Sequence, residues 1–213
     1  MDSLKEWHGK ALGKRAVQAL EKNGFQAGYY ADLVSASHYI LHLVQDGASV
    51  GIGGSQTERA LELGTKLKDK GCTVHDHGLP GLTVEERTEI RYRQLTADVF
   101  ISGTNAITLK GELMNRDSNG NRVAAMMFGP KKVIVVAGVN KIVRNLEEAD
   151  ARIRMVAAPM NNKRLGTENP CVELGECVDC RNPTRICNMT TILSRRPPLS
   201  EFHVILIGEE LGY

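Results

Sequence analysis

The chain has 213 residues, of which 42% are hydrophobic and 24% charged, and its formal net charge is +2. This length suits one large domain with a substantial core, and the near-neutral charge gives no general electrostatic case for binding nucleic acid. Apolar runs such as Val133–Val139 are too short to span a membrane. The opening residues hold no apolar stretch of the kind a secretory signal needs, so we expect a cytoplasmic protein.

The first half of the chain alternates predicted helices with short apolar segments. In the helical segments apolar residues recur every three or four positions, and the segments between them are brief and bounded by glycine. The predicted helices cover residues 3–23, 33–45, 57–70 and 84–95, and the predicted strands cover residues 48–53 and 72–75.

In the second half, residues 98–102 and 132–137 are continuously apolar, which is typical of strands buried on both faces of a parallel sheet. Between them, residues 111–115 and 122–128 predict a hairpin around Asp117–Gly120, although the second segment suits a helical turn equally well. The remaining predicted elements are a helix over 146–157 and a strand over 203–207. Together these elements predict a single α/β domain over residues 1–213, with an open, largely parallel sheet flanked by helices.

A glycine-rich turn follows the predicted strand over residues 48–53. Glycines let a ligand approach the main chain, and the free N–H groups at the start of the next helix favour an anion. The turn is neither a dinucleotide fingerprint nor a P-loop, so a plain tight turn with a helix cap remains an equal alternative. The candidate anion-binding residues of this glycine turn are Gly51, Gly53, Gly54, Ser55, Gln56 and Thr57.

Other polar residues stand where predicted strands end, and ligands of open α/β sheets bind beyond the carboxyl ends of the strands. Gly103, Thr104 and Asn105 follow the strand over 98–102, and Lys141 follows the strand over 132–137 and could counter a phosphate or carboxylate. Glu112 is the candidate catalytic carboxylate, for acid/base or nucleophilic work, with a solvated surface glutamate as the alternative.

Four cysteines stand close together in the cysteine-rich segment, residues 171–187. Cys171, Cys177, Cys180 and Cys187 have the spacing C-x5-C-x2-C-x6-C on a polar stretch that offers little core material. Clustered thiols in a cytosolic protein more often bind metal than form disulfides. Only Cys177 and Cys180 form the short hook that zinc sites usually use in pairs, so a [4Fe–4S] cluster is favoured over zinc, with free thiols as the third possibility.

The stretch LTADVFISGTNAITLKGELMNRDSNGNRVAAMMFGPKKVIVVAGVNKIV, residues 95–143, resembles the lactate-utilisation (LUD) domain family, in particular its LutC/YkgG-like members. The tail RRPPLSEFHVILIGEELGY and the opening helices fit the same family, so the resemblance covers essentially the whole chain. It implies a fold similar to the group of ribose-5-phosphate isomerase, glucosamine-6-phosphate deaminase and coenzyme A transferase. In those enzymes a glycine-rich turn holds an anion and a carboxylate does the chemistry. The cysteine-rich segment departs from the simplest form of the domain, which can lack it.

The resemblance implies a protein that supports the oxidation of L-lactate to pyruvate beside iron–sulfur electron-transfer partners. Two alternatives stay open: a transferase- or isomerase-like enzyme acting on a phosphorylated or coenzyme A-linked substrate, and a non-catalytic accessory subunit. In each case we expect a small anionic ligand, no nucleic acid and no membrane span. Apolar helix faces permit a homo-oligomer without demanding one. The sequence leaves open whether the protein is an enzyme on its own.

Overall fold

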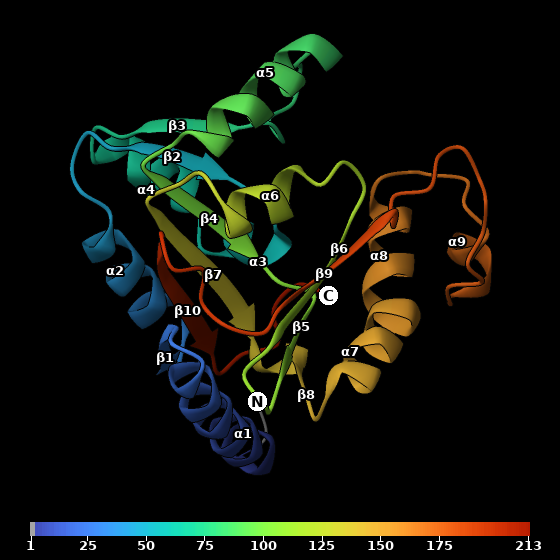
Figure 1. Ribbon diagram of the computed structural model, residues 1–213, viewed down its shortest axis with the longest axis horizontal. Helices are drawn as coiled ribbons and strands as arrows, with labels where there is room; N and C mark the ends of the chain where they lie inside the picture. The colour runs from blue at the N-terminus through green and yellow to red at the C-terminus, as the bar shows by residue number, and fades with distance from the viewer. Residues whose placement is uncertain (1–2) are drawn as a thin grey trace.

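A six-stranded sheet forms the centre of the fold, and all of its strand pairs are parallel (Figure 1). The structure is a computed structural model and describes residues 3–213. In spatial order the strands are β1 (Gln26–Tyr30), β10 (Glu201–Ile207), β7 (Lys132–Gly138), β4 (Val99–Gly103), β2 (Ser49–Ile52) and β3 (Thr73–Asp76). This confirms the predicted open parallel sheet, and it places every carboxyl end at the same edge.

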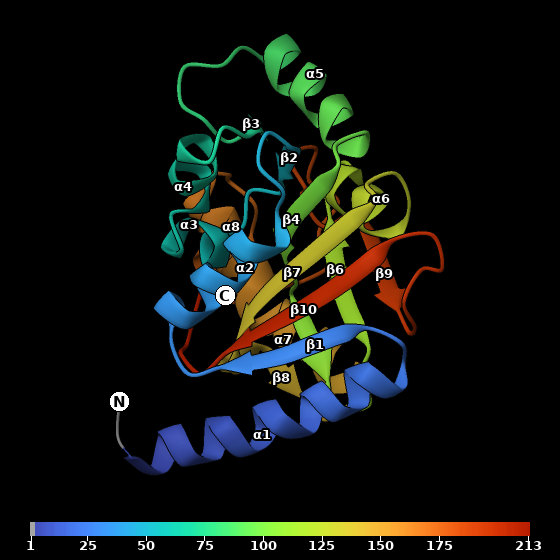
Figure 2. The same cartoon turned by 90° about the vertical axis from the view of Figure 1, so that its left-hand side faces the viewer.

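The central strands are buried on both faces because successive side chains point to opposite sides of the sheet. On β7, Val133 and Val135 belong to one apolar cluster, whereas Ile134 and Val136 belong to the other. Figure 2 shows β1, β10, β7 and β4 side by side, with α1 running along β1. The helices on the first face include α1 (Ser3–Lys22) and α6 (Asn121–Met127), and those on the second include α2 (Leu33–Leu43) and α4 (Leu63–Asp69).

A second, four-stranded sheet lies beside the first. Its strands, in order, are β8 (Ile142–Val143), β5 (Ala106–Thr108), β6 (Leu113–Asp117) and β9 (Met189–Leu193). A third apolar cluster joins this sheet to a long helical stretch. That stretch comprises α7 (Leu146–Arg152), a π-helical turn (Ile153–Ala157) and α8 (Ala158–Arg164). The cysteine-rich segment follows, and its short helix α9 (Cys171–Leu174) packs against α8 (Figure 1).

Two of the predicted elements are wrong. The helix predicted over 57–70 is two helices, α3 (Gln56–Ala60) and α4, because Glu62 has a left-handed backbone with φ of 54°. The hairpin predicted between 111–115 and 122–128 does not form. Instead β6 pairs with β5 and β9, and the second segment is α6, the helical alternative.

Four strands of the described chain went unpredicted. β1 lies at the edge of the large sheet and β9 at the edge of the small one, and both carry polar or half-exposed residues. β5 is only three residues long and β8 only two. Short edge strands give weak sequence signals because pairing, and not a buried apolar run, defines them. By contrast, the helix predicted over 84–95 matches α5 (Val84–Leu95), which begins with a capping box between Thr83 and Glu86.

Candidate anion-binding cleft

A cleft of about 510 Å³ opens where β2, β3, β4 and β7 end. Residues from the second sheet, α5, α8 and the chain's last two residues complete its walls. It lies beyond the carboxyl ends of the parallel strands, where ligands of open α/β folds bind. All predicted anion-site residues line it except Gly51 and Thr57: Gly53, Gly54, Ser55, Gln56, Gly103, Thr104, Asn105 and Lys141.

Gly51 and Thr57 do not line the cleft, and each affects it through a neighbouring residue. A Cβ at Gly51 would meet the Phe100 ring at 3.0 Å and Gln94 at 3.1 Å, so this glycine lets α5 approach the sheet closely. Thr57 is fully buried, and its Oγ1 accepts a hydrogen bond from Lys141 Nζ at 3.1 Å.

The glycine turn brings the ends of β2 and β4 into close contact. A Cβ at Gly53 would lie 2.5 Å from Ser102 Oγ, and a Cβ at Gly103 would lie 2.3 Å from Ser55 Oγ. Ser55 Oγ also caps α3 by accepting a hydrogen bond from the Thr57 N–H at 3.2 Å. The glycines therefore let two strand ends and a helix start share the floor of one cleft.

The cleft is strongly cationic. Asp117 is the one acidic side chain in the lining formed by residues 3–213, and it is paired with Arg122. Lys141 was predicted as a site residue from the sequence, whereas none of the arginines was. The cationic residues of the lining are Arg59, Arg87, Arg91, Arg116, Arg122, Lys141 and Arg164.

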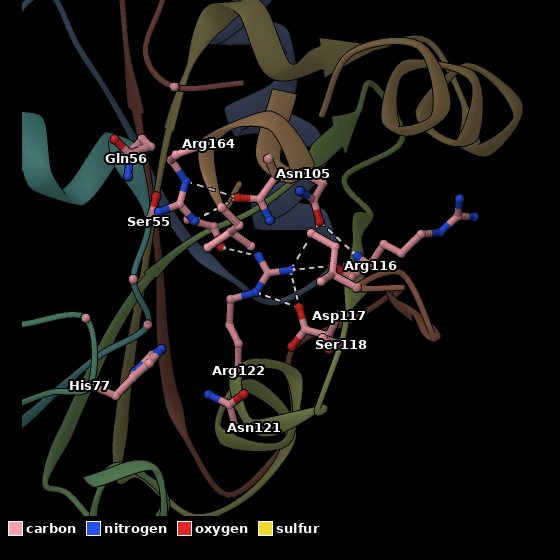
Figure 3. Close-up of a pocket in the computed structure, with 18 of the residues that line it drawn as sticks. Ser55, Gln56, His77, Asn105, Arg116, Asp117, Ser118, Asn121, Arg122 and Arg164 are labelled. Atoms are coloured by element: carbon pink, nitrogen blue, oxygen red, sulfur yellow. Dashed lines mark hydrogen bonds and ion pairs between the residues drawn. The ribbon is translucent and has the colours of Figure 1, made fainter. Parts of the chain in front are cut away.

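Arg122 organises the wall formed by β6 and the loop after β4 (Figure 3). Its Nε donates to Asp117 Oδ1 at 2.8 Å, its Nη1 donates to Asn115 Oδ1 at 2.9 Å, and its Nη2 donates to Asn105 Oδ1 at 3.1 Å. The guanidinium also donates to the backbone oxygens of Gly103 and Arg116. With its donors engaged in this way, Arg122 is a positioning residue that fixes the amides around it.

Lys141 is a buried cation of the cleft with a neutral hydrogen-bond partner. Its side chain is 3% exposed, and Thr57 Oγ1 is its hydrogen-bond partner. Burial, with Arg152 and Arg122 nearby, lowers the pKa of Lys141 to about 7. At neutral pH the ammonium and amine forms are therefore both well populated, and an anion beside Nζ would stabilise the ammonium.

Arg87 and Arg91 form a second cationic group on the opposite wall. They stand four residues apart on α5 and so share one face of the helix. Neither forms an ion pair within the described part of the chain, and the Nε of Arg91 is buried without a hydrogen-bond partner. Arg87 Nη1 donates to the His77 backbone oxygen at 2.8 Å, and burial lowers the pKa of the His77 side chain, with Arg91 adding to the effect.

A buried carboxyl stands behind this wall. Glu58 on α3 is 3% exposed, and burial followed by repulsion from Asp76 raises its pKa to about 7. Arg59 lies 3.7 Å from Asp76 at the rim of the cleft. Sequence reasoning passed over Glu58 because nothing in the predicted helix marked its position as buried.

Glu112 does not line the cleft. It stands between β5 and β6, where its Oε2 accepts a hydrogen bond from Thr108 Oγ1 at 2.8 Å. The catalytic role predicted for Glu112 therefore gains no support from its position, since its carboxylate closes a turn.

The four cysteines of the cysteine-rich segment are not among the lining residues, although their neighbour Ile186 is. Cys171 is buried, and the other three are partly exposed. Within residues 3–213, no three or more His, Cys, Asp or Glu side chains are already arranged as a formed metal site. None of the helices in this range has both the length and the apolar character needed to cross a membrane.

Comparison with known proteins gives the family. The family model of the LUD domain matches residues 13–207. This chain belongs to the LUD-domain family. The family is one of lactate utilisation. A crystal structure of a DUF162 family protein from Deinococcus radiodurans superposes with a TM-score of 0.54 at 13% sequence identity, covering 93% of this chain and 98% of that one. No curated protein matches the sequence.

Proposed function

We propose that this LUD-domain protein binds a small anionic substrate in its cationic cleft and supports the oxidation of a 2-hydroxy acid, L-lactate to pyruvate, beside iron–sulfur partner proteins. The supporting observation is the charge of the lining, which holds six arginines and Lys141 but a single acidic side chain. Arg122, Arg116 and Arg59 are paired with carboxylates, whereas the other four cations of the lining have no ion pair within residues 3–213. Cations collected at this density repel one another, and an anionic ligand relieves that repulsion.

The residues around Lys141 suit a carboxylate with an adjacent hydroxyl. The ammonium form of Lys141 attracts the carboxylate, while Ser55 and Thr104 line the same floor. Oxidation of lactate removes two electrons and two protons, and both protons pass to solvent, because the bound carboxylate keeps Lys141 in its ammonium form. In this proposal the electrons pass to the iron–sulfur partners.

One observation favours a second candidate, an enzyme of the transferase or isomerase type acting on a phosphorylated or coenzyme A-linked substrate. A three-carbon acid offers one carboxylate, whereas cations stand on both walls of the cleft, at Lys141 on one side and at Arg87 and Arg91 on the other. A ligand with two separated anionic groups would engage both walls. The cleft volume of about 510 Å³ also suits a ligand larger than lactate.

Calorimetric titration of the purified protein separates the two candidates. L-lactate and pyruvate form one arm, a phosphorylated three-carbon acid and coenzyme A form the other, and sulfate reports general anion affinity. Tight binding of lactate or pyruvate supports the first candidate, and preference for the phosphorylated ligands supports the second. If no ligand in either arm binds more tightly than sulfate, both candidates fail.

Variants on a single helix test whether the ligand occupies this cleft. Arg91→Gln removes a cation that lines it, whereas Arg93→Gln removes a 60% exposed cation that pairs with Glu89. Loss of a charge-assisted hydrogen bond costs about 1.5–3 kcal/mol, so we expect roughly 10- to 100-fold weaker binding for Arg91→Gln and little change for Arg93→Gln. Equal affinities in the two variants would place the ligand elsewhere.

A further inference from the structure

The cysteine-rich segment has little regular structure to hold it in place. Between the end of α8 at Arg164 and the start of β9 at Met189, the described chain contains α9 alone, and most side chains there are exposed or half-exposed. A stretch of this length without a core of its own is uncommon in a compact domain unless it carries a function or a staple.

Hydrogen bonds nevertheless gather its cysteines. Arg185 Nη1 donates to the Cys180 backbone oxygen, and its Nε donates to that of Cys187 at 3.2 Å, so one side chain joins the two positions. The Cys177 N–H donates to the Arg154 backbone oxygen at 2.9 Å, which fixes this residue beside the helical stretch that precedes α8. Cys171 begins α9, and α9 packs against α8, the helix that follows this stretch.

Two arginines contact the backbone of the cysteine-rich segment. Arg154 Nη2 donates to the Cys177 backbone oxygen at 3.2 Å, and Arg185, which binds the Cys180 and Cys187 backbone oxygens, pairs with Asp179 at 2.8 Å. Four thiolates around a dipositive metal core leave a net charge of −2. Positive side chains beside such a centre stabilise that negative charge. Four neutral thiols carry no charge for them to stabilise.

The same segment forms part of the cleft. Ile186 lines the cleft, and the Asn188 N–H donates to the Asp117 backbone oxygen at 2.9 Å. Arg116 also lines the cleft, and its Nε donates to Thr190 Oγ1 at 3.1 Å. These contacts join the chain around and just after the thiols to residues that face the proposed anion.

We propose that Cys171, Cys177, Cys180 and Cys187 hold a thiolate-bound metal centre beside the anion cleft, and that loading this centre changes the affinity of the cleft for anions. The thiols must turn toward a common point when metal binds, which the three partly exposed cysteines can do on a loop backbone. The coupling rests on the proposed anion cleft, whereas the centre itself does not. Both a [4Fe–4S] cluster and Zn²⁺ satisfy this donor chemistry.

Metal stoichiometry tests the centre without any anion. The wild type and the Cys177→Ser/Cys180→Ser variant are each incubated anaerobically with equimolar ferrous and ferric iron and sulfide, or with Zn²⁺ alone, and then desalted. Elemental analysis and visible absorbance are measured, with Cys72→Ser as the matched control because Cys72 is buried at the start of β3, outside the segment. We expect one centre per chain in the wild type and the control, and at least tenfold less metal in the double variant.

Iron with sulfide and visible absorbance identifies a cluster, and zinc without colour identifies a zinc site. A wild type that retains neither metal overturns the proposal even if the double variant misfolds. So does equal retention by the wild type and the double variant.

Sulfate affinity tests the coupling. Titration of the loaded and the metal-free wild type is expected to give dissociation constants that differ several-fold. Identical constants overturn the coupling while leaving the stoichiometry result intact. Failure of the proposed function gives a different result. In that case the fully metal-loaded protein binds neither lactate nor a phosphorylated ligand more tightly than sulfate.

Discussion

Lys141 joins two properties that are rarely found in one lysine. It is 3% exposed, and its hydrogen-bond partner is a neutral hydroxyl, that of Thr57. Removal from water disfavours the ammonium, and the charges of Arg152 and Arg122 act in the same direction, which explains a pKa of about 7. A bound anion has the opposite effect, so binding should raise this pKa and draw a proton from solution.

We predict that anion binding at pH 8 is accompanied by proton uptake. Above pH 7 the free protein carries mostly the amine form of Lys141, so sulfate must recruit a proton, and affinity should fall up to about tenfold per pH unit. Calorimetric titration with sulfate, which does not titrate in this range, in buffers of different ionisation enthalpy measures the proton count.

The variant Lys141→Met should bind sulfate weakly and without a proton. Lys131→Met is the control, because Lys131 is 85% exposed and pairs with Asp98 on the surface. Proton uptake that persists in Lys141→Met would assign the titration to another group.

The residues of the cleft were predictable from sequence to different degrees. Lys141, Thr104 and Asn105 could be found because they follow apolar strands, and strand ends meet at one edge of a parallel sheet. The arginines could not be found in this way. Arginine is common on solvated surfaces, and only the packing of α5, α6 and α8 reveals that Arg91, Arg122 and others converge.

At the scale of elements, the junction of β2, β4 and α3 decides the shape of the cleft floor. Ser55 follows β2 and contacts the end of β4. Its Oγ caps α3, and the same oxygen occupies the space beside Gly103. Any side chain at Gly103 must displace that oxygen and release the cap.

The variant Gly103→Ala should be destabilised by about 1–3 kcal/mol, because its Cβ would lie 2.3 Å from Ser55 Oγ. Ser55→Ala should cost about 1 kcal/mol through loss of the helix cap. In the double variant the clashing oxygen is gone, so its cost should be less than the sum of the two. Urea unfolding measures the three free energies, and strict additivity would show that the two residues do not compete for the same space.

Elements were predictable where periodicity and caps agreed, and not where tertiary pairing decided. α5 has a capping box at its start, and its bounds match the prediction. The break between α3 and α4 depends on the left-handed backbone of Glu62, a conformation that glutamate adopts without any sequence signal. β9 exists because it pairs with β6, and the paired residues, from Asp117↔Met189 to Leu113↔Leu193, lie 72 to 80 positions apart in the sequence.

At the scale of the whole molecule, a buried acid and a buried base each lower the free energy of unfolding. The acid does so most strongly above neutral pH and the base below it. Glu58 and Lys141 both have a pKa of about 7, raised from 4.5 in the first case and lowered from 10.5 in the second. Between pH 4.5 and 7 the folded state keeps the Glu58 proton that the unfolded chain releases, so stability falls as pH rises. Between pH 7 and 10.5 the unfolded chain keeps the Lys141 proton that the folded state releases, so stability rises with pH.

We therefore predict that these two groups together give the anion-free protein a minimum of stability near pH 7. Each group contributes a slope of at most about 1.4 kcal/mol per pH unit within its window. Glu58→Gln should flatten the fall between pH 5 and 7 and leave the rise above pH 7, whereas Lys141→Met should do the reverse. Urea unfolding at pH 5, 7 and 9 measures the slopes. A Glu58→Gln curve parallel to the wild type from pH 5 to 7 would contradict the assignment to Glu58. Saturating sulfate should fill in the minimum, because an anion beside Lys141 stabilises the ammonium that the fold otherwise disfavours.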